Sequence, residues 1–269
     1  MNRFLTIAAV AGVLGAAPAF AERQSAFGPG EQTTYKVEYL GMHAGSAQIT
    51  VGAETFQWGQ TVLPIVTLAR SEKMLDFYPI RDKLVSYWDP SQERSLGSDF
   101  FMDENKVKRR QRIQLDHAAG KATVMKQEEG KDERVGTHDI ASGTFDMAAA
   151  TFALRNKPLT VGETYERPVF TGRRSFVMKA TVEGKETLAT PMGKKDVLRV
   201  RVQTGFDGKF VAKRDLLAWF TADDARVPVR IEADFVLGTI RAELLDYKSG
   251  RRYALSPAHA APLEGSGGG

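Results

Sequence analysis

Two adjacent carboxylates, Asp223 and Asp224, are the first residues of this sequence whose type and spacing could support chemistry. They lie within LAWFTADDARVPVRIEADFVLG, residues 217–238. Two carboxylates can divide acid and base roles when their environments separate their pKa values, and glycoside hydrolases hold such groups about 5 to 10 Å apart. Adjacent strand residues point to opposite faces, however. A hydrolase would therefore require one of the two to face a second carboxylate across a cleft.

The same stretch is also typical of the turn of a β-hairpin. The short side chains of TADDAR can bond to nearby backbone amides. Pro228 would open the next strand, where its missing N–H donor is tolerated. Because turns are rich in such residues, the sequence favours a structural role here, and we expect no catalytic residue.

A basic run, KVKRRQR, offers a second kind of chemistry. Alternation on a strand would divide the run and the following isoleucine between two faces, one with Lys106, Lys108, Arg110 and Arg112, the other with Val107, Arg109, Gln111 and Ile113. The first face could bind phosphates or acidic glycans. Lysines and arginines also protect exposed β edges from pairing with other chains. The sequence favours this second reading, because anion binding needs convergence from other strands.

Aromatic residues provide a third set of candidates. MLDFYPI and DFFMDEN have a loop-like context between predicted strands, and apolar loop residues can line the rim of a ligand cavity or plug the end of a barrel. Phe77, Tyr78 and the strand residue Trp219 are the aromatic candidates for ligand binding.

Other constellations that carry chemistry are missing from the sequence. His43, His117, His138 and His259 stand far apart and have no metal-ligand spacing. The sequence contains no cysteine, no G-x-S-x-G motif and no G-x-x-x-x-G-K-[ST] phosphate loop. We therefore expect no metal site and no cofactor.

The first 21 residues have the features of a signal peptide. Arg3 precedes an apolar run from Phe4 to Ala17, and Ala19-Phe20-Ala21 forms a small-x-small site. Cleavage after Ala21 would leave a periplasmic or secreted chain without a later stretch of the roughly 20 apolar residues that a membrane-spanning helix needs. Its net charge falls from +4 to +3, because only Arg3 is lost. This balance is too mild to predict a nucleic-acid partner.

Short runs of alternating or β-branched residues dominate the rest of the chain. The predicted strands are TTYKVEY, SAQITV, TVLPIVTLA, KLVSYWD, RIQL, KATVMK, SFVMKATVEG, DVLRVRVQT, LLAWFTA, VPVRIEADFV and TIRAELLDY. Near the middle, Phe145, Ala148, Ala149 and Phe152 recur at helical spacing, with Thr144 as a candidate N-cap.

These elements predict a mainly β protein, an antiparallel barrel or sandwich built from two β-rich halves joined by one short helix. We place the β-rich domain at residues 27–248, with halves at about 27–136 and 158–248 and the helix at about 144–155. Residues 256–269, with the composition of a flexible end, are expected to be disordered.

Three separated motifs resemble one bacterial envelope family, domain of unknown function 3108. They are FGPGEQTTYKVEYLGMHAGSAQITV, TFALRNKPLTVGE and WFTADDARVPVRIEADFVLGTIRAEL, and the likeness extends from about Phe27 to Tyr247. The resemblance implies an exported, mostly β domain of the bacterial envelope. It implies no activity.

The sequence thus predicts a non-enzymatic binding or scaffolding protein that engages an envelope lipid, a glycan or a periplasmic protein. One alternative is a carrier of a hydrophobic or lipid ligand, which requires an apolar cavity inside a barrel. A carboxylate-dependent hydrolase is the least favoured. The oligomeric state and the strand order are left open.

Overall fold

The computed structural model describes residues 23–72, 79–105, 107–203, 215–235 and 238–255. The predicted signal peptide and C-terminal tail lie outside these residues. The first strands are β1 (Gln32–Tyr39), β2 (Met42–Val51), β3 (Thr55–Gln57), β4 (Gln60–Ser71), β5 (Arg81–Asp89), β6 (Arg94–Glu104), β7 (Val107–Asp116), β8 (Lys121–Glu128) and β9 (Arg134–Asp139). Helix α1 (Met147–Arg155) follows, and then β10 (Thr164–Phe170), β11 (Ser175–Thr190), β12 (Gly193–Gln203), β13 (Leu216–Thr221), β14 (Pro228–Phe235) and β15 (Gly238–Lys248).

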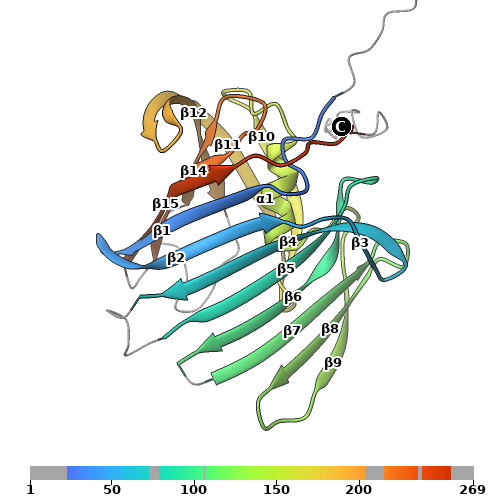
Figure 1. The fold of residues 1–269 in the computed structure, drawn as a ribbon. Coiled ribbons are helices and arrows are strands. Elements are labelled where there is room, and N and C mark those ends of the chain that lie inside the picture. The colour runs from blue at the N-terminus through green and yellow to red at the C-terminus, as the bar shows by residue number, and fades with distance from the viewer. Residues whose placement is uncertain (1–22, 73–78, 106, 204–214, 236–237, 256–269) are drawn as a thin grey trace, which may run out of the picture.

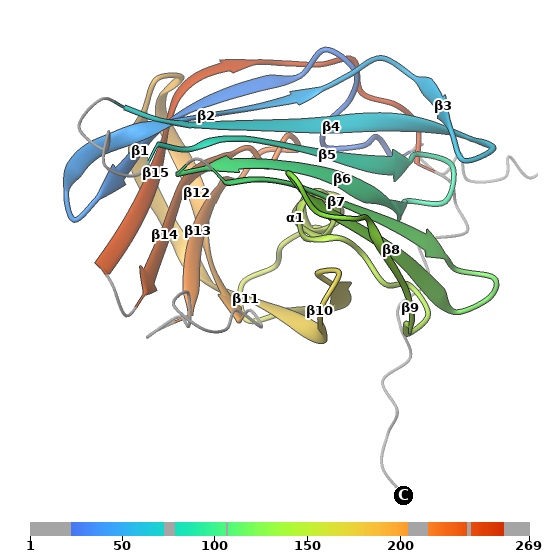
Figure 2. The same ribbon diagram turned by 90° about the horizontal axis from the view of Figure 1, so that it is seen from below.

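All of these strands belong to one antiparallel sheet. Its order is β10-β11-β12-β13-β14-β15-β1-β2-β4-β5-β6-β7-β8-β9, with β3 paired to β4 off this path (Figure 1). The two β-rich halves meet where β1 pairs with β15. Figure 2 shows the sheet curving round α1 like an incompletely closed barrel. The predicted mainly β, antiparallel architecture is confirmed, and the two halves form one curved sheet.

Helix α1 begins later than the sequence predicted, because a different residue caps it. Asp146 Oδ1 accepts hydrogen bonds from the backbone N–H groups of Ala148 (3.0 Å) and Ala149 (3.1 Å). These are donors that a helix start otherwise leaves unsatisfied. The predicted cap, Thr144, instead donates its hydroxyl to Ala141 O. The structure therefore corrects the N-cap from Thr144 to Asp146.

The concave side of the sheet is filled at one end by the helix and by aromatic rings. Phe27 packs edge-on against Phe152 at 4.7 Å between centroids and against Trp88 at 5.5 Å. Trp88 also stacks on Phe145, and its Nε1 donates to Tyr253 OH at 2.7 Å. This end of the barrel is a packed core, since these side chains interdigitate as in other protein interiors.

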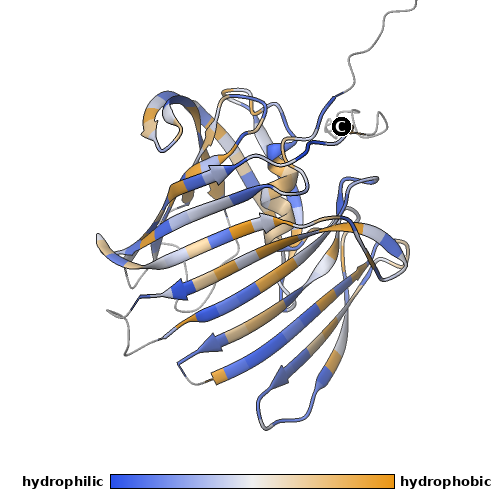
Figure 3. Cartoon of the chain, in the orientation of Figure 1, coloured by the Kyte–Doolittle hydropathy of each residue, from blue (hydrophilic) through white to orange (hydrophobic). Residues whose placement is uncertain are grey.

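The two faces of β4–β9 follow from the alternation of side chains along each strand, which Figure 3 shows as alternating hydropathy. We call the concave side the inner face. It carries Ser86, whose hydroxyl donates to Asp146 at 2.7 Å, and it carries Ile113 and Val124, which pack against Phe170 of β10. The opposite side is the outer face.

The segment DFFMDEN was predicted to be loop-like, and this was wrong. Most of it lies in β6, which is paired with β5 and β7 along almost its whole length. Phe100 and Met102 therefore belong to the inner face and Phe101 to the outer face. Pairing with β5 and β7 holds this segment as a strand, and the local sequence does not indicate that pairing.

Candidate anion-binding site

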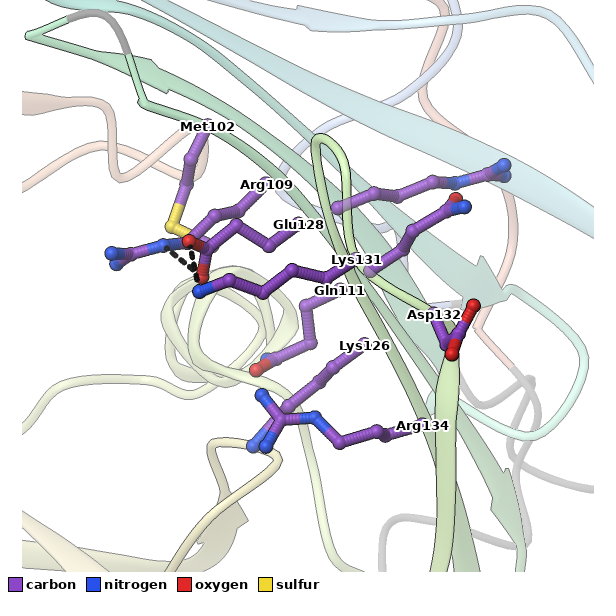
Figure 4. Close-up of a pocket in the computed structure, with 10 residues that line it drawn as sticks. Met102, Arg109, Gln111, Lys126, Glu128, Lys131, Asp132 and Arg134 are labelled. Atoms are coloured by element: carbon purple, nitrogen blue, oxygen red, sulfur yellow. Dashed lines mark hydrogen bonds and ion pairs between the residues drawn. The ribbon is translucent and has the colours of Figure 1, made fainter.

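A pocket of about 280 Å³ opens beside β6–β9 (Figure 4). It is lined by Met102, Arg109, Arg110, Gln111, Lys126, Gln127, Glu128, Lys131, Asp132 and Arg134. Five of these side chains are cationic and two are carboxylates. The pocket therefore has an excess of positive charge that favours an anionic group.

The pairing of β6–β9 places six of the ten pocket residues in two cross-strand rows on the inner face, whereas Arg110 and Gln127 form a pair on the outer face at the edge of the pocket. In the first row Met102 is opposite Arg109, which is opposite Glu128. In the second row Gln111 is opposite Lys126, and Lys126 is opposite Arg134. Directly opposed side chains in a sheet lie about 5 Å apart at their Cβ atoms. The sheet itself thus brings the polar ends of each row together.

The first row is balanced in charge. Glu128 Oε2 lies 3.4 Å from Arg109 Nε, and Glu128 Oε1 lies 2.6 Å from Lys131 Nζ. Both of the carboxylate's oxygen atoms are thereby paired with cations. Glu128 is accordingly not free to neutralise the second row.

The second row carries two cations that no carboxylate of the described residues neutralises. Lys126 Nζ donates to Gly172 O at 2.9 Å, in the turn between β10 and β11, and Gln111 Nε2 donates to Thr171 O at 3.0 Å in the same turn. Within the described part of the chain, neither Lys126 nor Arg134 forms an ion pair. In Figure 4 these two side chains extend toward one another, whereas the Asp132 carboxylate points away.

The electrostatics of Lys126 show the effect of this arrangement. Burial lowers the pKa of its ammonium group, and the nearby charges of Arg173 and Arg134 lower it further. Like charges that lie close together disfavour one another's charged forms. A bound anion would relieve this repulsion, so the row is suited to accept a phosphate or carboxylate oxygen through charge-assisted hydrogen bonds.

On the outer face, two of the predicted ligand-binding cations already have a partner. Arg112 donates to both oxygen atoms of Asp99, at 2.9 and 3.0 Å, and Arg110 Nη2 lies 3.5 Å from the same carboxylate. Burial acts to raise the pKa of Asp99, but hydrogen bonds from Arg112 and Tyr87 hold it below its usual value. Asp99 thus compensates much of the positive charge there.

The remaining basic candidates are less constrained. Lys108 Nζ lies 3.9 Å from Glu129 Oε1 on an exposed surface. Lys106 lies outside the described residues, as do the aromatic candidates Phe77 and Tyr78. Ligand binding at these positions stays a prediction.

Trp219 is part of a small apolar cluster with Val197 and Val229. Its side chain is buried, and its Nε1 donates to Glu186 Oε1. Arg230 lies over the indole ring, 5.6 Å from the ring centroid. These contacts account for the position of the Trp219 side chain by packing.

Asp223 and Asp224 lie in the turn between β13 and β14, as the hairpin interpretation predicted. Asp223 Oδ1 accepts hydrogen bonds from Thr221 Oγ1 at 2.7 Å and from the backbone N–H of Ala225 at 3.1 Å. Both aspartates are exposed. Asp223 therefore holds the turn through a local side-chain-to-backbone bond.

Sequence reasoning identified one of the five cations that line the pocket, Arg110, and missed the other four, Arg109, Lys126, Lys131 and Arg134. A signal for Lys126 was present, because alternation in KATVMK places it on the same face as Ala122 and Val124. A lysine in register with core positions is unusual. For Arg109 the signal was alternation in the basic run, which places it on the same face as Ile113 and opposite Lys108, Arg110 and Arg112.

The fold and the pocket together define a class of protein: a β-barrel-like domain made of one curved sheet, with an enclosed helix and a basic pocket beside the sheet. Within this class, the chain belongs to the family described as a protein of unknown function (DUF3108), whose family model matches residues 34–245. This confirms the resemblance seen in the sequence. No curated protein matches the chain.

Solved structures resemble the chain at low sequence identity. A β-barrel-like protein of the DUF1849 domain from Brucella abortus is 10% identical with a TM-score of 0.54, and the match covers 84% of this chain and 99% of that one. This likeness concerns the fold alone. A protein from Bacteroides fragilis, described as exported and YmcC-like, is 10% identical with a TM-score of 0.35, over 85% of this chain and 100% of that one. That score is too low to support an inference.

In the described part of the chain, no helix has the length and apolar character required to cross a membrane.

Proposed function

We propose that this protein is an exported, non-enzymatic binding protein of the cell envelope, and that it binds an envelope component by an anionic group in the inner-face pocket. The signal-peptide features of residues 1–21 support export to the periplasm or beyond. The expected ligand is a lipid or a glycan that carries a phosphate or a carboxylate.

The observation that carries this proposal is the uncompensated pair Lys126 and Arg134. Their strands place them directly opposite one another, and the one pocket carboxylate that forms ion pairs, Glu128, is already occupied by Arg109 and Lys131. Two converging cationic donors, one of them partly desolvated, can form charge-assisted hydrogen bonds to a single anionic group. Partial burial makes such bonds stronger than they would be in water.

A carrier of a hydrophobic ligand is the second candidate, and one observation favours it. Leu84 and Phe100 lie on the inner face next to the pocket rows, and each is only half-buried. At the helix end, by contrast, the interior is filled by Phe27, Trp88 and Phe152. Apolar surface for a ligand is therefore offered by the part of the inner face away from the helix.

Titration calorimetry of the full chain at low salt tests the proposal, with inorganic phosphate and glycerophosphoglycerol as probes. We expect Lys126→Gln/Arg134→Gln to weaken binding by at least about tenfold, because each charge-assisted hydrogen bond contributes about 1.5–3 kcal/mol. Preference for glycerophosphoglycerol would indicate a lipid headgroup, and equal affinity a simple phosphate site.

Lys121→Gln provides the matched control, since Lys121 is on the same strand but on the outer face, paired with Asp139. It should leave both affinities unchanged. If the inner pair of substitutions had no more effect than this control, the pocket would not be the binding site.

A further inference from the structure

The second pocket row does not end at the pocket. On the other side, it continues through residues that lie directly opposite one another on neighbouring strands. From β2 to β6 these are Ile49, Thr67, Leu84 and Phe100. Phe100 is opposite Gln111, which leads to Lys126 and Arg134. One continuous cross-strand row on the inner face is thus mainly apolar over β2–β6 and cationic over β8 and β9.

The described residues do not fully cover the apolar part of this row. Leu84 and Phe100 are only partly buried, and Ile49 is partly buried against the edge of the helix-end core. Two residues further along β5 and β6, by contrast, Ser86 is 0% and Ser98 is 4% exposed. The Ser86 hydroxyl is bonded to the helix cap, so α1 reaches that neighbouring row. The inner-face side chains of β5 and β6 therefore become partly exposed beyond the part of the sheet that α1 covers.

The dimensions of the sheet fix the distance between the apolar and cationic parts. Neighbouring strands are about 4.8 Å apart, so Phe100 is about 10 Å from Lys126 across two strand spacings, and Ile49 is about 14 Å beyond Phe100. An anionic head on Lys126 and Arg134 would place an attached chain beside Phe100 and Leu84. Met102 lines the pocket itself and continues the apolar surface to its edge.

We propose that the ligand of the pocket is an anionic amphiphile, a single molecule whose phosphate or carboxylate head binds Lys126 and Arg134 and whose acyl chain lies along Phe100, Leu84 and Ile49. This inference rests on the proposed function and adds the chemical class of the ligand. Charge complementarity at one end of the row and partly exposed apolar side chains at the other match the two parts of such a molecule.

Binding of 1-myristoyl-lysophosphatidylglycerol, below its critical micelle concentration, tests the proposal against glycerophosphoglycerol, which has the same head and no chain. We expect the full chain to bind the lysolipid at least about 100-fold more tightly. Each methylene buried should raise the affinity by up to about fourfold, so a series of shorter acyl chains should show a steady loss.

Leu84→Thr/Phe100→Thr should weaken lysolipid binding by at least about tenfold and leave the affinity for glycerophosphoglycerol unchanged. Threonine retains a strand-forming side chain, and circular dichroism verifies that the variant is folded. Phe56→Thr is the matched control, because Phe56 is an exposed aromatic residue of β3 that does not line the pocket. It should bind both probes like the wild type.

Equal affinity of the wild type for the two probes, or no dependence on acyl-chain length, would overturn the amphiphile proposal without the use of any variant. The proposed function would still stand if Lys126→Gln/Arg134→Gln weakened the binding of glycerophosphoglycerol. It would fail separately if those two substitutions affected neither probe.

Discussion

At the scale of single residues, Asp82 shows how the inner face perturbs an ionisable group. Its Oδ1 accepts a hydrogen bond from the backbone N–H of Asp103 at 3.1 Å. Burial raises its pKa from an ordinary 3.8 to about 6, and the charges of Glu104 and Asp103 act in the same direction against that hydrogen bond. Asp82 is therefore partly protonated in mildly acidic solution.

A raised pKa in the folded state has a defined consequence for stability. Between about pH 4 and pH 6 the folded chain binds more protons at Asp82 than the unfolded chain does. The stabilisation from this group is complete below its unfolded pKa and is lost as the pH rises through 6. We expect Asp82→Asn, which retains the Oδ1 acceptor, to raise the melting temperature more at pH 7.5 than at pH 4.5. An equal change at both pH values would contradict the assignment.

Residue-scale prediction from the sequence succeeded where the cause is local. Asp223 was assigned to a turn, because its side chain bonds to atoms within two residues. The N-cap was misassigned, because Ser86 and Ser95 of distant strands also donate to Asp146. The sequence around Asp146 does not indicate hydrogen-bond partners that are so distant along the chain.

At the scale of elements, helix α1 is held at its C-terminal end by a buried ion pair. Arg155 Nη1 and Nη2 bind Glu31 Oε1 and Oε2 at 2.6 and 3.0 Å, and Nη2 also donates to Ala225 O at 2.9 Å. The contacts tie the helix to the segment before β1 and to the turn between β13 and β14. They thereby connect the two halves of the sheet through the enclosed helix.

Removal of one charge of this pair should be costly. Glu31→Gln leaves the Arg155 guanidinium buried without a compensating charge, and we expect it to lower the free energy of unfolding by about 3–5 kcal/mol. Urea denaturation monitored by circular dichroism measures this change. In the double variant Glu31→Leu/Arg155→Met no charge is stranded, and the loss should be smaller than in Glu31→Gln. A larger loss in the double variant would show that the hydrogen bonds to Ala225 matter more than the charge.

Most of the strands were predicted from alternation, whereas β3, β6, β9 and β10 were not. β7 was expected on a basic run whose side chains alternate between faces, and the structure contains it at Val107–Asp116. β6 was not predicted, since its apolar residues Phe100, Phe101 and Met102 follow one another without alternating with polar ones. Its two neighbours in the sheet stabilise it as a strand.

At the scale of the whole molecule, the sequence left one barrel and two packed sheets open. The pairing of β1 with β15 decides between them, and it joins segments at opposite ends of the domain. The pocket has the same origin, because it forms only when β6, β7, β8 and β9 are in register. Periodicity indicates which residues share a face, but it does not indicate which strands are neighbours.

The most direct test of the central claim is a crystal structure of the full chain with 1-myristoyl-lysophosphatidylglycerol. Our account predicts phosphate oxygen atoms within hydrogen-bond distance of Lys126 Nζ and the Arg134 guanidinium, with the acyl chain against Phe100 and Leu84. Phosphate bound instead beside Lys108 and Arg112 on the outer face would contradict it.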